Sequence, residues 1–186
     1  MPNRFRLVKA RKGAVALDAL RLSWEMRRFS KTTDGKSRLW RSIRFPDHPV
    51  TNAAYWVLQG GRAFYPIENY FRIKTGKDDT AGVIAWGVTT KTRTKQMKEY
   101  NLPVGAIEIG NAAIHPRYRG QGAMAFAIKR VVSKLREQGH TIFFMRVNAH
   151  NEAMKATAQK AGFAVHKRVS APRKPENDFL VYTRFG

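Results

Sequence analysis

The sequence predicts an α/β fold in which strands and helices alternate through the second half of the chain. Three observations lead to this prediction. The clearest helical pattern covers residues 121–138, where apolar side chains recur every three or four positions. Apolar stretches suited to strands lie on both sides of it, at 104–114 and 141–147. The chain has 186 residues, 43% of them hydrophobic, which is enough for one well-cored domain and short for two.

The first part of the chain shows weaker patterns. Residues 5–10 are predicted to form a strand and residues 14–29 a helix, although the apolar spacing in that helix is irregular. The stretch 30–50 is polar and basic, and a short helix near 51–59 is expected to end at Gly60-Gly61. These elements add little to the fold prediction.

From residue 69 the strand and turn signals become sharper. Residues 70–73 and 82–90 are predicted to be two strands around a polar turn, and residues 91–101 a basic connector. The strand 104–114 is expected to carry a bulge at Gly110-Asn111. The elements expected after the main helix are the strand 141–147, the helix 151–161, and the strands 163–169 and 178–185.

The composition of the chain excludes several kinds of functional site. The chain has no cysteine, which excludes disulfides, thiolate zinc sites and a cysteine nucleophile. Its histidines have no ligand spacing with carboxylates, so no metal site is predicted. No run approaches the ~18 uninterrupted apolar residues of a membrane span, and no signal peptide is apparent. We therefore expect a soluble, cytoplasmic protein.

The charge of the chain is extreme. Lysine and arginine total 35 against 13 acidic residues, a net charge of +22. Such a charge attracts polyanions at long range, so nucleic acid, or an assembly that contains it, is the expected partner. The alternatives are a basic surface kept for solubility and an anionic membrane, for which no amphipathic anchor is seen. The residues expected to bind nucleic acid are Arg27, Arg28, Lys31, Arg38, Arg41 and Arg44.

A glycine-containing loop joins the strand 104–114 to the main helix. Residues 114–124 read IHPRYRGQGAM, so the strand leads through two glycines directly into the strongest helix. A helix start presents unpaired backbone N–H groups and the positive end of the helix dipole. Glycine lets a pyrophosphate approach the backbone, and Arg119 adds a fixed positive charge. The loop lacks the lysine of a Walker loop and the third glycine of a dinucleotide fingerprint.

This loop is similar to the coenzyme A-binding motif of the GNAT superfamily of N-acetyltransferases, Arg/Gln-x-x-Gly-x-Gly/Ala. Arg119 and Gly122 fit the motif, whereas Met124 stands at the last position, where a backbone N–H suffices. A second block, NEAM from Asn151 followed by KAGF at 160–163, also resembles the family. The two blocks span roughly residues 104–165. The resemblance implies a central mixed sheet of about six to seven strands flanked by about four helices.

The resemblance also implies acetyl-CoA as cofactor and indicates where it is held. Its pantetheine arm would pair with the backbone of 112–114 and reach Asn151, for which capping of the next helix is the alternative. The residues implied as cofactor-binding are Ala112, Ala113, Ile114, Arg119, Gly120, Gln121, Gly122, Ala123, Met124, Ala125 and Asn151.

Glu108 is the candidate catalytic residue. It lies on the strand before the loop, where some family members place a glutamate general base, and a salt-bridged or surface glutamate is the alternative. Ala158 stands where many members carry the tyrosine that protonates the departing thiolate. Tyr182 is a candidate substitute, and His115 fits the family's scaffold rather than its chemistry.

Two functions follow. The first is an N-acyltransferase that moves an acetyl group from acetyl-CoA to a primary amine, on or near nucleic acid. The second is a catalytically silent, basic GNAT-like protein that binds nucleic acid or serves as a structural component of a nucleoprotein or virion assembly. We expect one domain over 1–186, with a basic part (1–68), a coenzyme A-binding core (69–165) and C-terminal strands (166–186).

Overall fold

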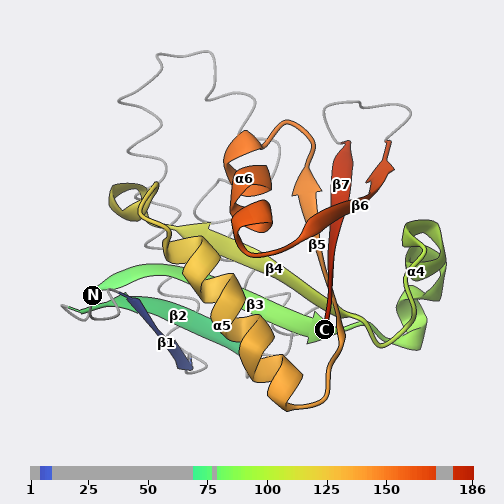
Figure 1. The fold of residues 1–186 in the computed structure, drawn as a ribbon, viewed down its shortest axis with the longest axis horizontal. Coiled ribbons are helices and arrows are strands. Elements are labelled where there is room, and N and C mark those ends of the chain that lie inside the picture. The colour runs from blue at the N-terminus through green and yellow to red at the C-terminus, as the bar shows by residue number, and fades with distance from the viewer. Residues whose placement is uncertain (1–4, 10–68, 77–78, 171–177) are drawn as a thin grey trace. The chain divides into compact units, whose positions relative to one another are not determined.

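A computed structural model of the chain describes residues 5–9, 69–76, 79–170 and 178–186 (Figure 1). Within these residues seven strands form one sheet in the order β1-β2-β3-β4-β5-β7-β6. Strands β4 and β5 pair in parallel, whereas β1 with β2, β2 with β3, β5 with β7, and β7 with β6 pair antiparallel. The mixed sheet with helices confirms the predicted fold class. The helices predicted at 14–29 and 51–59 lie outside the described residues.

The chain divides into two compact units, residues 1–85 with 111–123, and residues 86–110 with 124–186. Strands β3 (Thr80–Val88) and β4 (Ile107–Ile114) each contribute residues to both units. The other elements of the first unit are β1 (Phe5–Lys9), β2 (Tyr70–Thr75) and the 3-10 helix η3 (Pro116–Tyr118). The other elements of the second unit are η2 (Lys91–Arg93), α4 (Thr94–Tyr100), α5 (from Ala123, at the end of the first unit, to Glu137), β5 (Ile142–Asn148), α6 (Glu152–Lys160), β6 (Ala164–Val169) and β7 (Phe179–Phe185).

Helix α5 is the element that the sequence predicted most clearly. Its apolar positions recur at three and four residues, which places them on one face of a helix. That face is buried, whereas Lys129, Arg130 and Lys134 on the opposite side are exposed. The buried side chains of α5 are Ala123, Met124, Ala127, Ile128, Val131, Val132 and Leu135.

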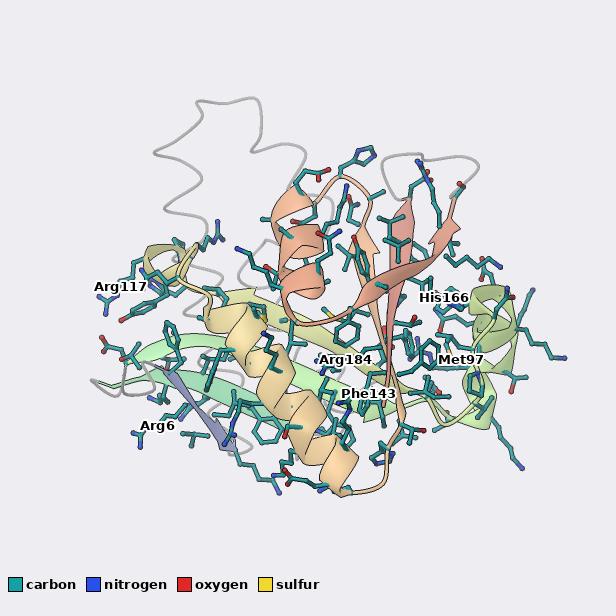
Figure 2. All side chains as sticks on the ribbon, viewed as in Figure 1. Arg6, Met97, Arg117, Phe143, His166 and Arg184 are labelled. Atoms are coloured by element: carbon teal, nitrogen blue, oxygen red, sulfur yellow. The ribbon has the colours of Figure 1, made fainter. Side chains whose placement is uncertain are left out.

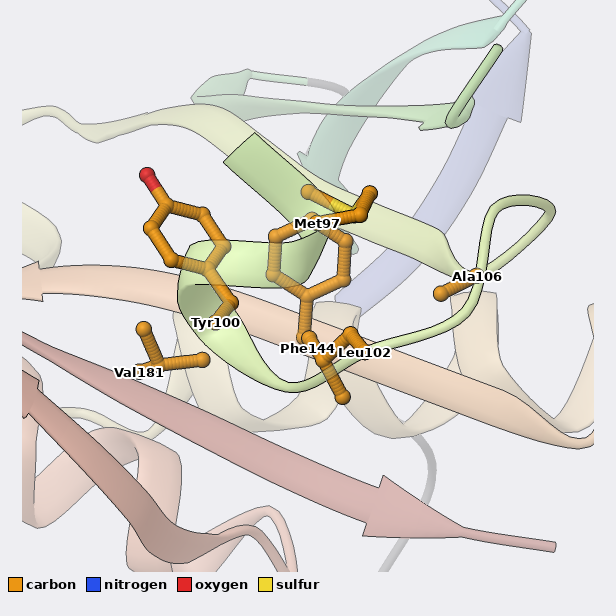
Figure 3. Close-up of a cluster of buried hydrophobic side chains, with 6 residues drawn as sticks. All are labelled: Met97, Tyr100, Leu102, Ala106, Phe144 and Val181. Carbon is orange, nitrogen blue, oxygen red and sulfur yellow. The ribbon is translucent and has the colours of Figure 1, made fainter. Parts of the chain in front are cut away.

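The prediction of a connector at 91–101 is wrong. The segment forms η2 and α4, and Asn101 ends α4 in the left-handed conformation with φ of 57°. Only Met97 and Tyr100 of α4 are buried, too few to give a helical period in the sequence. The helix is held by a hydrophobic cluster instead, drawn in Figure 3, which comprises Met97, Tyr100, Leu102, Ala106, Phe144 and Val181.

Side chains of β6 cover the carboxyl end of α4. The Lys167 ammonium donates to the carbonyl oxygen of Glu99 at 2.6 Å, and His166 Nε2 lies 3.0 Å from the carbonyl oxygen of Tyr100. Figure 2 shows His166 beside this helix. Because the last carbonyls of a helix lack partners within it, these contacts fix α4 to the sheet.

Strand β4 contains one residue more than its partner β3 requires. The N–H of Thr89 donates to the carbonyl of Ala106, and the N–H of His115 donates to the carbonyl of Ala81. Between these two bonds the chain advances by eight residues from Ala81 to Thr89, along β3, and by nine from Ala106 to His115, along β4. An extra residue of this kind is a β-bulge. The predicted bulge position, Gly110-Asn111, lies within this interval of β4.

No helix among the described residues is long and apolar enough to cross a membrane. The described residues also contain no group of three or more His, Asp or Glu side chains that could hold a metal ion.

Candidate functional site

The loop between β4 and α5 has the backbone that an anion site needs. Gly120 and Gly122 have φ of 72° and 79°, a conformation that side chains disfavour. A Cβ added at either glycine would meet no atom of the described residues within 4 Å, so these residues leave the space beside this backbone open. Helix α5 starts immediately afterwards at Ala123, and the N–H groups of its first turn have no partner within the helix. Arg119 is exposed in the same loop.

The chain just before the loop is held by contacts with Asp79, which precedes β3. Arg117 Nη2 pairs with the Asp79 carboxylate at 2.5 Å, and it also donates to the Tyr118 hydroxyl, which itself donates to Asp79 at 3.0 Å. The hydrogen bond and electrostatic interaction with Tyr118, and to a smaller extent the charge of Asp79, raise the pKa of Arg117. The brace ties η3 to the start of β3, and Arg117 is labelled in Figure 2. These contacts hold Arg117 and Tyr118, the residues immediately before the loop.

Two further side chains support the same turn. His115 Nδ1 accepts from the N–H of Arg117 at 3.3 Å and caps η3, which is the scaffold role expected for this histidine. Gln121 Nε2 donates to the carbonyl of Arg117 at 2.7 Å. The other amide atom, Gln121 Oε1, is buried and has no hydrogen-bond partner among the described residues. The loop thus contains a buried acceptor beside its open glycine backbone.

Strand β3 approaches the end of β4 unusually closely at Gly82. A Cβ built on Gly82 would lie 2.3 Å from the carbonyl oxygen of Ala113 and 2.6 Å from Cδ1 of Ile114. Side chains of natural residues do not reach such distances, so only glycine fits. Gly82 consequently sets the position of the backbone at Ala112 to Ile114, the segment expected to pair with a pantetheine arm.

Glu108 lies buried between two guanidinium groups. Its Oε2 is paired with Arg93 Nη1, and its Oε1 accepts from Arg146 Nε at 2.7 Å. The Glu108 side chain is 3% exposed, that of Arg93 11% and that of Arg146 39%. Both carboxylate oxygens are therefore already engaged in charge-assisted hydrogen bonds. The alternative of a salt-bridged glutamate describes this geometry, and the role of Glu108 as a base stays a prediction.

Asn151 caps helix α6. Its Oδ1 accepts from the N–H of Met154 at 3.0 Å, which satisfies one of the free donors at the start of that helix. The capping alternative is therefore confirmed, and the contact of Asn151 with a pantetheine arm stays a prediction. Met124 and Ala125 lie in the first turn of α5, and for Met124 the resemblance required only the backbone N–H.

Comparison with known proteins decides the family. A model of the acetyltransferase (GNAT) family matches residues 37–163, more than half of the chain. The chain belongs to the GNAT acetyltransferase family. Members of this family use acetyl-CoA, which is therefore the cofactor of this chain. No curated protein matches the sequence.

Solved structures with low sequence identity share the fold. An acetyltransferase of the GNAT family from Bacillus anthracis has a TM-score of 0.62 at 15% identity, covering 98% of this chain and 95% of that one. A spermidine N-acetyltransferase chimera from Vibrio cholerae and hSSAT has a TM-score of 0.64 at 10% identity, with coverages of 98% and 96%. The microcin C7 self-immunity acetyltransferase MccE, solved with acetyl-CoA and AMP, has a TM-score of 0.63 at 15% identity, with coverages of 99% and 93%.

The loop of this GNAT chain fits the pyrophosphate of acetyl-CoA. The space that the described residues leave open beside Gly120 and Gly122 suits phosphate oxygens, and the start of α5 and Arg119 supply positive potential. The position that many family members fill with tyrosine carries Ala158, which is fully buried in α6. Strand register places Tyr182 opposite Met145, on the other face of the sheet from Thr183, Phe144 and Glu108.

Sequence reasoning missed the two arginines that hold Glu108. Arg93 and Arg146 are 15 and 38 residues away from it in the chain, and neither belongs to a motif. No sequence signal locates these partners, because the burial of the Glu108 carboxylate, which requires them, is seen only in the structure. The residues predicted to bind nucleic acid, Arg27, Arg28, Lys31, Arg38, Arg41 and Arg44, lie outside the described residues.

Proposed function

We propose that this GNAT acetyltransferase transfers the acetyl group of acetyl-CoA to a primary amine, on or near nucleic acid. One observation carries the proposal of cofactor binding, namely the open, positive-φ backbone at Gly120 and Gly122 that leads into α5. Acetyl-CoA supplies an acetyl group activated as a thioester. The loop from Arg119 to Ala125 would hold its pyrophosphate, and the backbone of Ala112 to Ile114 its pantetheine arm.

The reaction also requires that the amine lose a proton and that the departing thiolate gain one. An amine must lose a proton to attack, and Glu108 is the proposed acceptor of that proton. A carboxylate oxygen has two lone pairs, so Glu108 can accept a further hydrogen bond while Arg93 and Arg146 hold it. The ion pairs would keep the carboxylate oriented during the transfer. Because alanine at 158 donates no proton, the departing thiolate would be protonated from solvent.

Replacing Arg119 with glutamate tests the cofactor site. Hydrogen bonds to charged groups contribute about 1.5–3 kcal/mol, so we expect acetyl-CoA to bind about 10- to 150-fold more weakly to Arg119→Glu. Isothermal titration calorimetry measures this change. Arg130→Glu, the same charge reversal on the exposed face of α5, is the control and should bind like the wild type. A wild-type protein that binds no acetyl-CoA would end the proposal.

The net charge of +22 supports the second part of the proposal, an association with nucleic acid. If six basic residues neutralise phosphates, log affinity for duplex DNA should fall with log salt at a slope of about −5. Replacing Arg38, Arg41 and Arg44 together with glutamine should reduce that slope by about 3 units and leave acetyl-CoA binding intact. Fluorescence anisotropy over a salt series measures both slopes. A wild-type chain that does not bind DNA or RNA at low salt contradicts the association.

A second candidate function is a GNAT-like protein that binds nucleic acid, or serves in a nucleoprotein or virion assembly, without catalysis. It is favoured by Ala158, which offers no acid at the position of the family's tyrosine. Binding of acetyl-CoA without release of free thiol in the presence of any amine would select this alternative.

A further inference from the structure

Two arginines with fixed positions lie where α5, α6 and β7 contact one another. Arg136, in the last turn of α5, donates from Nη2 to the carbonyl oxygen of Phe185 at 2.8 Å. Arg184 of β7, which is labelled in Figure 2, donates from Nη1 to the carbonyl oxygen of Ala161 at 2.5 Å, at the end of α6. Both acceptors are neutral carbonyl oxygens, so these bonds hold the two guanidinium groups in place and leave their positive charges intact.

The charges of these two arginines act on each other. Burial, followed by the positive charge of Arg136, lowers the pKa of Arg184. Gly162 leaves room for the Arg184 guanidinium, because a Cβ on Gly162 would lie only 3.2 Å from Arg184 Nη1. Like charges held near each other repel and raise the positive potential of the surface, and an anion bound beside both relieves the repulsion. The pair is therefore suited to an anionic ligand.

Lys129 extends this positive charge along α5. Lys129 and Arg136 are both exposed and stand seven residues apart, close to two turns of helix. Their side chains therefore lie in one row about 10 Å long. Over about 10 Å of its axis, one strand of duplex DNA presents about three phosphates. A rigid helix thus offers its cations at a fixed spacing that a regular duplex can match.

We propose that Lys129, Arg136 and Arg184 bind the phosphate backbone of duplex DNA, and we call these three residues the α5–β7 surface. The proposal rests on the association with nucleic acid in the proposed function, for which it names a surface among the described residues. Ammonium and guanidinium groups bind phosphate oxygens through charge-assisted hydrogen bonds. Because contacts with phosphates carry no sequence information, binding at this surface should not depend on base sequence.

Loss of these cations should weaken the dependence of DNA affinity on salt. Each phosphate contact contributes about 0.9 to the slope of log affinity against log salt. The double variant Lys129→Gln/Arg136→Gln should therefore lower the slope by about 2 units, and the triple variant that adds Arg184→Gln by about 3 units. Fluorescence anisotropy of a short labelled duplex over a salt series measures the slopes. The double variant changes exposed residues only, so it tests the surface independently of any effect of Arg184→Gln on the end of α6.

The matched control removes two exposed lysines from another helix. Lys95→Gln/Lys98→Gln on α4 lowers the net charge as much as the double variant does. It should change the slope by less than about 0.5 units, because these lysines lie outside the α5–β7 surface. A slope that falls equally in the control and in Lys129→Gln/Arg136→Gln, or in neither, overturns the proposal.

Glu137 allows a test by gain of affinity. Its Oε1 lies 3.5 Å from Ser133 Oγ. Because Ser133 stands between Lys129 and Arg136 on the helix, this negative charge lies beside the row of cations. Glu137→Gln should tighten binding of duplex DNA about 2- to 5-fold at low salt.

Glu99→Gln on α4 is the control for the gain of affinity. Glu99 is exposed, and its loss raises the net charge as much as the loss of Glu137 does. Because salt screens charges outside the contact, Glu99→Gln should change DNA affinity less than about 1.5-fold. Equal gains in the two variants, or no gain in Glu137→Gln, contradict the surface.

The results also separate this proposal from the proposed function. A wild type that binds duplex DNA, with a slope unchanged in the surface variants, keeps the association with nucleic acid and overturns the α5–β7 surface. A wild type that does not bind duplex DNA at low salt removes both the association and the surface, whereas calorimetry with acetyl-CoA still tests the cofactor site.

Two further probes distinguish other anions from DNA. Phosphatidylcholine vesicles that contain phosphatidylserine test a membrane, and binding to these vesicles without binding to duplex DNA would overturn the proposal. Acetyl-CoA also carries phosphates, and its affinity should be unchanged in the surface variants. Weaker binding of acetyl-CoA with unchanged binding of DNA would assign these cations to the cofactor and overturn the proposal.

Discussion

Gly82→Ala is expected to weaken acetyl-CoA binding about 10- to 100-fold and to destabilise the fold by about 1–3 kcal/mol. The added Cβ would lie 2.3 Å from the carbonyl oxygen of Ala113, a backbone atom that can move only with its strand. Relief of the clash therefore displaces the backbone from Ala112 to Ile114, the segment proposed to pair with the pantetheine arm. The displacement also strains the bond from the N–H of His115 to the carbonyl of Ala81.

Calorimetric titration and thermal unfolding measure the two effects. The matched control is Gly76→Ala in the turn after β2, because a Cβ at Gly76 has no atom of the described residues within 4 Å. That variant should bind acetyl-CoA normally and melt at or slightly above the wild-type temperature, since alanine lowers the entropy of the unfolded chain. If Gly82→Ala behaves like Gly76→Ala, strand β3 does not position the cofactor segment.

Glu108→Gln is expected to lower turnover about 100-fold or more and the free energy of unfolding by about 3 kcal/mol. The amide keeps the shape of the side chain and removes the carboxylate that pairs with both Arg93 and Arg146. Breaking a buried ion pair costs about 3–5 kcal/mol, and the partial exposure of Arg146 places this variant at the lower end. Affinity for acetyl-CoA should change little, because Glu108 precedes the proposed cofactor segment on β4.

Glu99→Gln is the control for this charge change. Glu99 is an exposed residue near the end of α4, and its loss should leave stability within about 0.5 kcal/mol of the wild type. Chemical denaturation, steady-state kinetics and titration of acetyl-CoA measure the three quantities. Stability that falls while turnover stays at the wild-type level would show that Glu108 only holds the two arginines. Wild-type stability in Glu108→Gln would contradict the burial of the charge cluster.

Features that depend on neighbouring residues in the chain were predictable from the sequence. Helix α5 follows from an apolar period over fifteen residues, and its start follows from the glycines at 120 and 122. The bounds of β1, β5, α6, β6 and β7 lie within a few residues of those predicted. The loop and its motif also identified the family, because an anion-binding turn is built from consecutive residues.

Features that depend on distant residues were decided only by the tertiary structure. Helix α4 has two buried side chains, and it exists because Phe144 and Val181, far along the chain, complete its cluster. Glu108 was recognised by its place before the loop, whereas its two arginine partners come from η2 and β5. Gly82 showed no signal, since a close approach between strands leaves no trace in the sequence of one of them. The sequence by itself thus determined the fold and the anion loop, because local periodicity and glycine conformation encode them. Only the tertiary structure shows which charged groups surround Glu108, because Arg93 and Arg146 are remote from it in the sequence and meet it only in the folded chain.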